Sequence, residues 1–516
     1  MNKRLIIAGF IIFSVTLLFS GCTKNFDKIN TDPNSILNVE PHQLLASALR
    51  STTQYRMIRN RNFNNELMQV TVNMSDADAT VFRYDFRATW SDYLWNGFYS
   101  ELTNFHDMYH IAKGDSSNPQ KSYMGISLIM QALLYSILTD TYGDIPYSQA
   151  NRARVEYGGI KEPAFDHQKD IYLGLFEKLE EANELLSANQ PIHTEADLIY
   201  RGNVSKWRKF GNSLYLRLLL RVSGKQEVAA SVIAKIKEIA DGSPSKYPVF
   251  ENAAESAILK WNSWSGLVSP YVNSVRAQDF RSPGLGEFFI NNLVFWKDPR
   301  LDGRNYGIDG INRWGIAPSG GAYVGVESGY EPGSDVTRAS YFYATDNSVA
   351  GKSPPAITLQ TDSLTGMIMN HAEVEFILAE AALKGWINGP VDKYYKDGVK
   401  SSINVWLPQW NEDIDTYLTT ANMQLIPGEP FADAMEKIHL QKYYALFIID
   451  YQQWFEYRRT GLPRLPIGKG VMNNGVMPAR MVYPVYVQST NPVNYKAAVT
   501  AQGPDQISTQ VWWQKP

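Results

Sequence analysis

Apolar side chains recur every three or four residues in several segments of the chain, the spacing that places them on one face of an α-helix. In the first of these segments Tyr123, Ile126 and Met130 follow this rule. Helices are predicted on this basis over residues 121–139, 169–187, 204–221, 370–386 and 433–457. Because the apolar faces need partners and the turns between neighbouring helices are short, the pattern predicts a mainly α protein built from stacked helix–turn–helix units.

The segment from about residue 242 to 370 has no helical periodicity. It is rich in glycine and proline, and it also carries large aromatic residues: Trp261, Trp264, Trp296, Trp314, Tyr323 and Tyr330. Long irregular segments inside a folded protein are usually functional loops or an embedded subdomain. We therefore expect a loop-rich insertion here, and the proline-containing segment 460–516 is also predicted to be loop-like.

The first 21 residues have the pattern of an export signal, with Lys3 and Arg4 ahead of a mostly apolar run that ends at Phe19. Residues 18–22, LFSGC, resemble a bacterial lipobox, although an aliphatic residue is more usual at position 19. We expect a signal peptide over 1–21, a lipid-modified Cys22 and a turn-rich tether over 22–35, and no other stretch is predicted to span a bilayer. A plain secretory signal with an incidental cysteine is the alternative.

Composition removes several classes of function. Lys and Arg number 49 and Asp and Glu 52, so the net charge is −3 and the basic surface of a nucleic-acid-binding protein is not expected. One cysteine allows neither an intrachain disulfide nor a cysteine-based metal cluster. Aromatic residues make up 13% of the chain, enough to leave some on the surface.

The chain lacks the motifs of common catalytic sites. It has no His-Glu-x-x-His zinc motif and no Gly-x-Ser-x-Gly nucleophile elbow. His106 and His110 lie four residues apart on one predicted helix, but no third ligand is evident and a structural role is expected. We therefore predict no catalytic residues, no metal and no cofactor.

Several motifs, taken together, resemble one known family. Residues 138–150, LTDTYGDIPYSQA, resemble the most recognisable motif of the SusD/RagB lipoproteins. Further similar segments follow in the family's order at residues 163–172, 197–214, 373–386 and 441–461, and residues 25–34, NFDKINTDPN, are similar to the SusD-like branch. The ordered set covers nearly the whole chain after the signal peptide.

The resemblance implies a fold and a role. Such proteins are mostly α-helical, with tetratricopeptide-like helix pairs scaffolding an irregular, loop-rich ligand-binding half. They are lipid-anchored at the outer membrane, face outward, cap a SusC-like TonB-dependent transporter and capture oligosaccharides, or sometimes peptides, without altering them. For this chain the resemblance implies one SusD-like domain over 36–516, with the helical scaffold over about 36–240 and 366–460 and the insertion over about 242–370.

A sugar-binding site needs exposed aromatic rings, because the C–H face of a sugar sits well on a ring, and it needs polar neighbours for the hydroxyls. Two segments fit this requirement, residues 76–92 and 261–330. The candidate ligand-binding residues are Arg83, Tyr84, Trp90, Trp264, Trp314, Tyr323 and Tyr330. By contrast, Trp95, Trp207, Trp386 and Trp454 lie in helical stripes and are expected in the core.

Three other functions remain open at this stage. Peptide capture by the same family would be favoured by pockets lined with Arg or Asp. A lipid-anchored glycoside hydrolase would use a pair of carboxylates, which the sequence spacing does not single out. A scaffold protein without a small ligand would be indicated if the aromatic residues of the loops were buried.

Overall fold

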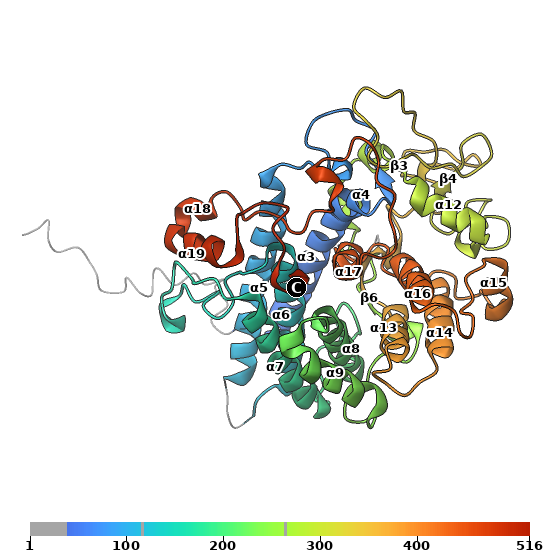
Figure 1. The fold of residues 1–516 in the computed structure, drawn as a ribbon. Helices are drawn as coiled ribbons and strands as arrows, with labels where there is room; N and C mark the ends of the chain where they lie inside the picture. The colour runs from blue at the N-terminus through green and yellow to red at the C-terminus, as the bar shows by residue number, and fades with distance from the viewer. Residues whose placement is uncertain (1–38, 115–117, 263–265, 516) are drawn as a thin grey trace, which may run out of the picture. The chain divides into compact units, whose positions relative to one another are not determined.

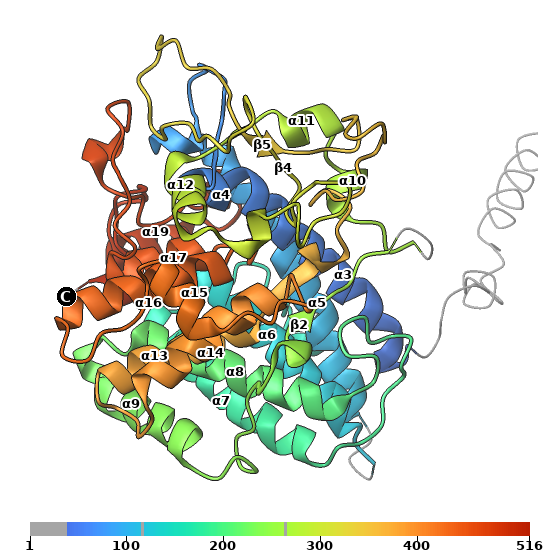
Figure 2. The same cartoon turned by 90° about the vertical axis from the view of Figure 1, so that its right-hand side faces the viewer.

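Most of the regular structure is α-helix in the computed structural model, which describes residues 39–114, 118–262 and 266–515 (Figures 1 and 2). The longer helices are α3 (Pro41–Arg59), α5 (Asp92–Lys113), α6 (Lys121–Tyr142), α7 (Gln168–Ser187), α8 (Val204–Val222), α9 (Gln226–Asp241), α12 (Glu287–Trp296), α13 (His371–Leu383), α14 (Val391–Asn404), α16 (Phe431–Ala445), α17 (Gln452–Thr460) and α19 (Pro492–Gln502). The shorter ones are α4 (Asn65–Leu67), α10 (Pro270–Asn273), α11 (Ala277–Arg281), α15 (Ile414–Thr420) and α18 (Val487–Thr490). The predicted mainly α fold is confirmed.

Helices that follow one another in the chain pack side by side. The series α3, α5, α6, α7, α8 and α9 makes consecutive contacts, and α13 packs on α14, on α16 and back on α8. Figure 2 shows α6, α7 and α8 next to one another. Stacking of this kind buries one apolar face of each helix against the next, as helix-pair repeats do.

Helix α6 forms the centre of this stack, and all of its residues after Lys121 are buried. Of the helices in the described part of the chain, it is the one long and apolar enough to cross a membrane. The sequence predicts no membrane span outside the signal peptide, and α6 meets only the length and composition of one. Its apolar window is buried entirely within the fold, which identifies α6 as a core helix.

Hydrogen bonds at their ends fix where two scaffold helices begin and end. The side chain of Asn370 accepts from the N–H of Glu373 at the start of α13. At the other end of a helix, Gly143 stops α6 with a φ of 86°, a conformation that favours glycine. The next residue, Asp144, accepts from the N–H of Gln168 at the start of α7. The YGDIP segment of the sequence motif is therefore architectural.

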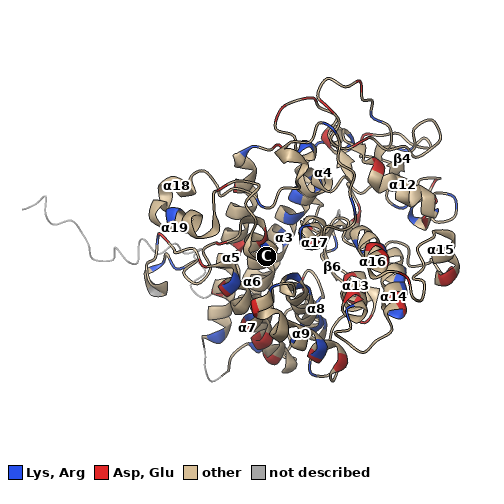
Figure 3. Ribbon diagram, viewed as in Figure 1, with Lys and Arg blue, Asp and Glu red and all other residues tan. Residues whose placement is uncertain are grey.

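Buried ion pairs join helices that are distant in sequence. The guanidinium of Arg217 on α8 donates to both carboxylate oxygens of Glu373 on α13, each at 2.6 Å. Arg56 on α3 pairs with Asp450 at 2.7 Å. Glu375 and Glu380 on α13 are buried as well, so this acidic run serves helix packing. On the outside, positive and negative residues are interspersed over α7, α9 and α14 (Figure 3).

Short antiparallel strand pairs organise the irregular segment between α9 and α13. The strands are β1 (Thr71–Val72), β2 (Ala257–Ile258), β3 (Gly284–Leu285), β4 (Ile316–Ala317), β5 (Tyr341–Phe342) and β6 (Met367–Met369). They pair as β1 with β3, β2 with β6 and β4 with β5. Because β1 precedes the insertion in sequence, its pairing with β3 brings the loop that follows β1 against the inserted segment (Figure 2).

Candidate ligand-binding site

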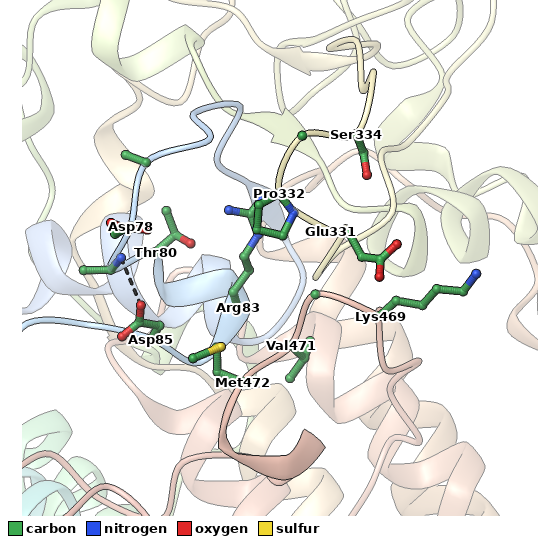
Figure 4. A pocket seen from close by; sticks show the side chains of 14 residues that line it. Asp78, Thr80, Arg83, Asp85, Glu331, Pro332, Ser334, Lys469, Val471 and Met472 are labelled. Atoms are coloured by element: carbon green, nitrogen blue, oxygen red, sulfur yellow. Dashed lines mark hydrogen bonds between the residues drawn. The ribbon is translucent and has the colours of Figure 1, made fainter.

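Three loops from distant parts of the chain enclose a cavity of about 700 Å³, here called the loop pocket (Figure 4). Its walls come from residues 77–85, 331–334 and 469–472. The lining residues are Ala77, Asp78, Ala79, Thr80, Arg83, Asp85, Glu331, Pro332, Gly333, Ser334, Lys469, Gly470, Val471 and Met472. The volume lies within the range of ligand sites in proteins.

Backbone hydrogen bonds hold the three loops together. The N–H of Met472 donates to the carbonyl of Arg83 at 2.7 Å, and the N–H of Gly470 donates to the carbonyl of Gly329 at 2.7 Å. A Cβ on Gly470 would lie 2.3 Å from the carbonyl oxygen of Tyr330, so only glycine allows this approach. The pocket is thus formed by tertiary contacts and does not depend on one flexible loop.

Arg83 is the central side chain of the pocket wall. Its Nε donates to the carbonyl of Tyr330 at 2.9 Å and its Nη2 donates to Asp76 at 2.9 Å. Its guanidinium carbon lies 4.7 Å from the centre of the Tyr330 ring and 4.8 Å from that of Phe82. Asp76 also accepts from the N–H of Gly333 at 2.7 Å. This N–H and Arg83 lower the pKa of Asp76, so its carboxylate stays charged between the two loops.

The groups that face the cavity are mainly polar and include more acids than bases. Asp78 and Asp85 lie on one side in Figure 4, and Glu331 and Lys469 lie on the other. Hydroxyl groups come from Thr80 and Ser334. Among the described residues, no aromatic side chain lines this pocket. The arrangement suits a ligand rich in hydroxyl groups or amines, held by hydrogen bonds.

The structure places three of the predicted aromatic residues inside the protein. Tyr84 is 5% exposed, Trp314 0% and Tyr330 6%. The expectation that these rings are open to a ligand is wrong. Trp314 packs against Phe289 and Phe447 in the core, and Tyr330 is covered by Phe82 and Arg83. Loops that pack closely on one another bury their large rings, because that removes apolar surface from water.

The remaining predicted residues have different positions. Arg83 lines the pocket, as expected of a ligand-contacting residue, although its side chain is buried. Trp90 is half-buried beneath Arg59, whose guanidinium lies 4.7 Å from its ring. Tyr323 is half-buried and accepts from the side-chain amide of Asn312 at 2.9 Å. Trp264 lies outside the described residues.

Sequence reasoning did not identify the third wall of the pocket. Lys469 and Met472 belong to the segment after α17, which the sequence marks only as loop-like. The available signal was the close spacing of Gly468 and Gly470, since a Cβ on Gly468 would lie 2.3 Å from the carbonyl oxygen of Ser328. Such glycines indicate that another backbone passes close by, but not which one.

One buried cluster has the composition of a metal site. Ligand atoms of Glu380, His439 and Glu456 all lie within 4.8 Å of one another. Arg459 donates to both carboxylates, at 2.6 Å and 2.8 Å, and Lys442 donates to Glu456 at 2.8 Å. Burial alone would raise the pKa of Glu380, but Arg459 and His439 hold it well below its ordinary value. The side-chain cations of the protein already neutralise this cluster, which makes it a structural ion network.

His106 and His110 form a close histidine pair on α5. Their Nε2 atoms are 3.1 Å apart, and both rings contact Tyr157. Burial, and to a smaller degree His110, lowers the pKa of His106 to about 4, so its ring is neutral at pH 7. No Asp, Glu or Cys in the described part of the chain completes a three-ligand cluster with this pair. The aromatic packing fits the structural role predicted from the sequence.

Comparison with solved structures shows where this fold occurs. A SusD homologue from Bacteroides fragilis superimposes with a TM-score of 0.72 at 24% identity, covering 93% of this chain and 100% of the other. One from Bacteroides uniformis has a TM-score of 0.70 at 23% identity, covering 92% and 99%. A chitin-binding SusD homologue from Flavobacterium johnsoniae has a TM-score of 0.72 at 18% identity, covering 92% and 98%. At these identities the likeness shows the fold.

The sequence comparisons define the family. No curated protein matches the chain in a sequence search. The profile of one family, SusD-like, described as starch-binding and associating with the outer membrane, matches residues 33–484. This match covers most of the chain and includes all three walls of the loop pocket. The chain therefore belongs to the SusD-like family of carbohydrate-binding proteins that associate with the outer membrane.

Proposed function

We propose that this protein captures oligosaccharides in the loop pocket and delivers them, unaltered, to a SusC-like TonB-dependent transporter. The observation that carries the proposal is a preformed polar cavity of about 700 Å³, built from three interlocked loops in a chain of the SusD-like family. A chitin-binding relative with the same fold supports a saccharide as the ligand.

Recognition in this pocket rests on hydrogen bonds. Stacking on Tyr84, Trp314 or Tyr330, as expected from the sequence, is excluded by their burial. Asp78, Asp85 and Glu331 instead provide acceptors for sugar hydroxyls. Arg83 uses Nε and Nη2 within the wall, and its Nη1 makes no hydrogen bond to any described residue, so it is available to donate to a ligand. Because the wall is already assembled, binding does not have to order it.

The cellular setting follows from the lipobox and from the family. Cleavage before Cys22 and acylation of its thiol and amine would anchor the chain by several acyl chains, which hold a protein firmly at a membrane. Residues 1–38, including Cys22, lie outside the described part of the chain. The family's description places its members at the outer membrane, and the anchored protein would face outward over the transporter.

A basic peptide is the second candidate ligand. Three carboxylates and two cations line the pocket, and an acid-lined pocket favours positively charged side chains or an amino terminus. A neutral oligosaccharide and a basic peptide differ in their response to salt. Binding of the peptide weakens steeply as ionic strength rises, whereas binding of a neutral sugar hardly changes.

The test is calorimetric titration of the full chain, purified in detergent, with chitin and starch oligosaccharides and with a lysine-containing tripeptide. Replacing Asp78 or Glu331 by Ala is expected to weaken binding of the cognate ligand about tenfold, the loss of one charge-assisted hydrogen bond. The matched control is Asp335→Ala, an exposed acid one residue beyond the pocket wall. If Asp78→Ala and Glu331→Ala leave binding as unchanged as the control does, the assignment of the ligand site to the loop pocket is contradicted.

The same samples test the absence of catalysis. Incubation of each bound oligosaccharide with the pure protein, followed by chromatography of the products, is expected to return it intact. Cleavage that disappears in the Asp78→Ala or Glu331→Ala variant would instead identify a glycoside hydrolase with a carboxylate pair. Co-purification of a barrel transporter with the anchored protein tests the partner, and loss of membrane association in Cys22→Ser tests the anchor.

A further inference from the structure

A second cavity, of about 400 Å³, lies between α5, the segment of residues 146–165 and α18. We call it the aromatic pocket. The residues of its lining that matter most are Tyr99, Gln149, Arg152, Lys161, Phe165 and Tyr486. It shares no lining residue with the loop pocket. Figure 1 shows α18 and α19 beside the segment that follows α6.

Aromatic rings form one wall of this pocket, and part of that wall is open to solvent. Tyr486 is 41% exposed, while Tyr99 and Phe165 are half-buried. Behind them Trp95 is packed 5.0 Å from the ring of Tyr99 and 6.2 Å from that of Phe165, measured between ring centres. The sequence predicted accessible rings in residues 76–92 and 261–330, whereas in this cavity an exposed ring lies beside two half-buried ones.

Hydrogen bonds hold the wall in place without a ligand. The hydroxyl of Tyr99 donates to the carbonyl of Pro146 at 2.7 Å, and that of Tyr486 donates to the side-chain oxygen of Asn96. The side-chain amide of Asn491 donates to the carbonyl of Pro163 at 2.7 Å. The three segments that form the pocket are therefore joined to one another, and the ring faces are preorganised.

The charge of the aromatic pocket is opposite to that of the loop pocket. Arg152 and Lys161 line it, both are exposed, and neither side chain forms a hydrogen bond or ion pair with another described residue. Among the described side chains, no Asp or Glu lines it. Nearby Arg154, by contrast, is paired with Asp107 at 3.4 Å. The exposed Glu162 follows Lys161 in sequence but does not line the cavity.

Neutral polar groups complete the site. Gln149 accepts from the N–H of Ala164 at 2.9 Å, and its Nε2 makes no hydrogen bond to a described residue. Asn151 and Thr490 also line the cavity. Amide and hydroxyl groups beside ring faces match a saccharide, whose hydroxyls surround a flat C–H face. Two unpaired cations in addition match a carboxylate on that saccharide.

We infer that the aromatic pocket is a second binding site, specific for an acidic saccharide unit such as a uronic acid. The sugar ring lies against Tyr486 and Tyr99, and its carboxylate is held by Arg152 and Lys161. The acid-lined loop pocket repels the same ligand, so the two cavities select ligands of different charge. This inference does not depend on what the loop pocket binds.

The test is titration of the full chain with an oligogalacturonate trimer, a hyaluronan tetrasaccharide and the carboxyl-reduced, neutral form of the trimer. At least one of the two acidic probes is expected to bind at least about tenfold more tightly than the neutral one, with an affinity that falls as salt rises. The double variant Arg152→Gln/Lys161→Gln is expected to lose that preference. The control Arg154→Gln/Lys169→Gln removes the same charge outside the pocket and is expected to keep it.

Ring contact is tested separately. Tyr486→Phe keeps the ring and is expected to bind within about threefold of the parent, whereas Tyr486→Ala removes the aromatic contact and is expected to weaken binding about tenfold. Equal binding of neutral and acidic trimers, no binding of either acidic probe, or no effect of the Arg152/Lys161 variant would overturn the inference. So would tight binding of a peptide with a free carboxyl terminus, such as acetyl-Ala-Ala-Phe, at this site in place of the sugars. Asp78→Ala is expected to leave binding of the acidic probes unchanged, which separates this result from failure of the loop pocket.

Discussion

The guanidinium of Arg83 and the carbonyl of Tyr330 are joined by a hydrogen bond of 2.9 Å across 247 residues of sequence. The same guanidinium lies over the ring of Tyr330, with 4.7 Å between its carbon and the ring centre. One side chain therefore sets both the position of the loop 331–334 and the burial of the preceding tyrosine. The sequence predicted that the ring of Tyr330 would contact a ligand. In the structure this ring is buried, and the segment around it forms a wall of the polar loop pocket.

Replacing Arg83 by Ala is expected to lower the free energy of unfolding by about 1–3 kcal/mol, since it leaves the buried carbonyl of Tyr330 without its donor. Arg83→Lys keeps the charge but not the planar fork, and it is expected to recover only part of the loss. Denaturant unfolding followed by tryptophan fluorescence measures both changes. The exposed Arg87→Ala serves as a control, expected within about 0.5 kcal/mol of the parent. Equal stability of Arg83→Ala and Arg87→Ala would show that the contacts of Arg83 with Tyr330 do not stabilise the fold.

The buried pair Arg217–Glu373 is expected to behave differently from surface pairs. Glu373→Leu leaves Arg217 buried without its partner and is expected to cost about 3–5 kcal/mol. The double variant Arg217→Met/Glu373→Leu removes both charges and is expected to be more stable than Glu373→Leu alone. At the exposed pair Lys393–Asp397, Asp397→Ala is expected to change stability by less than about 1 kcal/mol. A double variant less stable than Glu373→Leu would contradict this account.

Glu66 is expected to make stability depend on pH. Burial raises the pKa of its carboxyl to about 8 from an ordinary 4.5, against the opposing effects of Arg61 and the N–H of Phe82. Between these values the folded chain holds a proton that the unfolded chain has released. The contribution to stability is therefore complete below about pH 4.5, and it falls as pH rises towards 8, by up to about 1.4 kcal/mol per pH unit.

Glu66→Gln, which mimics the protonated acid, is expected to flatten this part of the profile and to be more stable than the parent at pH 8. Thermal unfolding midpoints between pH 5 and pH 8 measure the difference. Glu287→Gln, at an exposed acid on α12, is expected to leave the profile of the parent unchanged. Parallel profiles for the parent and Glu66→Gln would rule out Glu66 as the source of the pH dependence.

Gly143→Ala tests the end of α6. The residue has a φ of 86°, and an added Cβ would lie 1.6 Å from Oε1 of Gln502, which accepts from the N–H of Asp144 at 2.7 Å. Gly428 has a φ of 81° with open space around it, so Gly428→Ala reports the backbone cost alone. Gly143→Ala is expected to cost about 1–3 kcal/mol more than Gly428→Ala by denaturant unfolding. Equal costs would mean that Gln502 moves aside freely.

The helical half of this protein was predictable from sequence because helix formation is a local property. The apolar stripe through Tyr123, Ile126 and Met130 marks α6 directly, and the glycine and proline content of residues 242–370 marks the irregular segment. The ordered set of motifs that includes residues 138–150 indicated the family, and the profile match over residues 33–484 confirms it. The family motifs consist of residues that pack helices together and form turns. Such features appear as local patterns of residue spacing, so they can be found in the sequence.

The candidate site depended on contacts that sequence spacing does not encode. Trp314 and Tyr330 lie in a loop-like segment, yet both rings are buried because the loop folds back on α12 and on the chain near Arg83. Lys469 reaches the loop pocket from the other end of the chain, and Tyr486 forms the open aromatic wall of a different cavity. The sequence by itself determined the helices, the irregular insertion and the family. Only the tertiary structure decided which rings meet water and which charges share a cavity, because burial depends on which distant loops pack together.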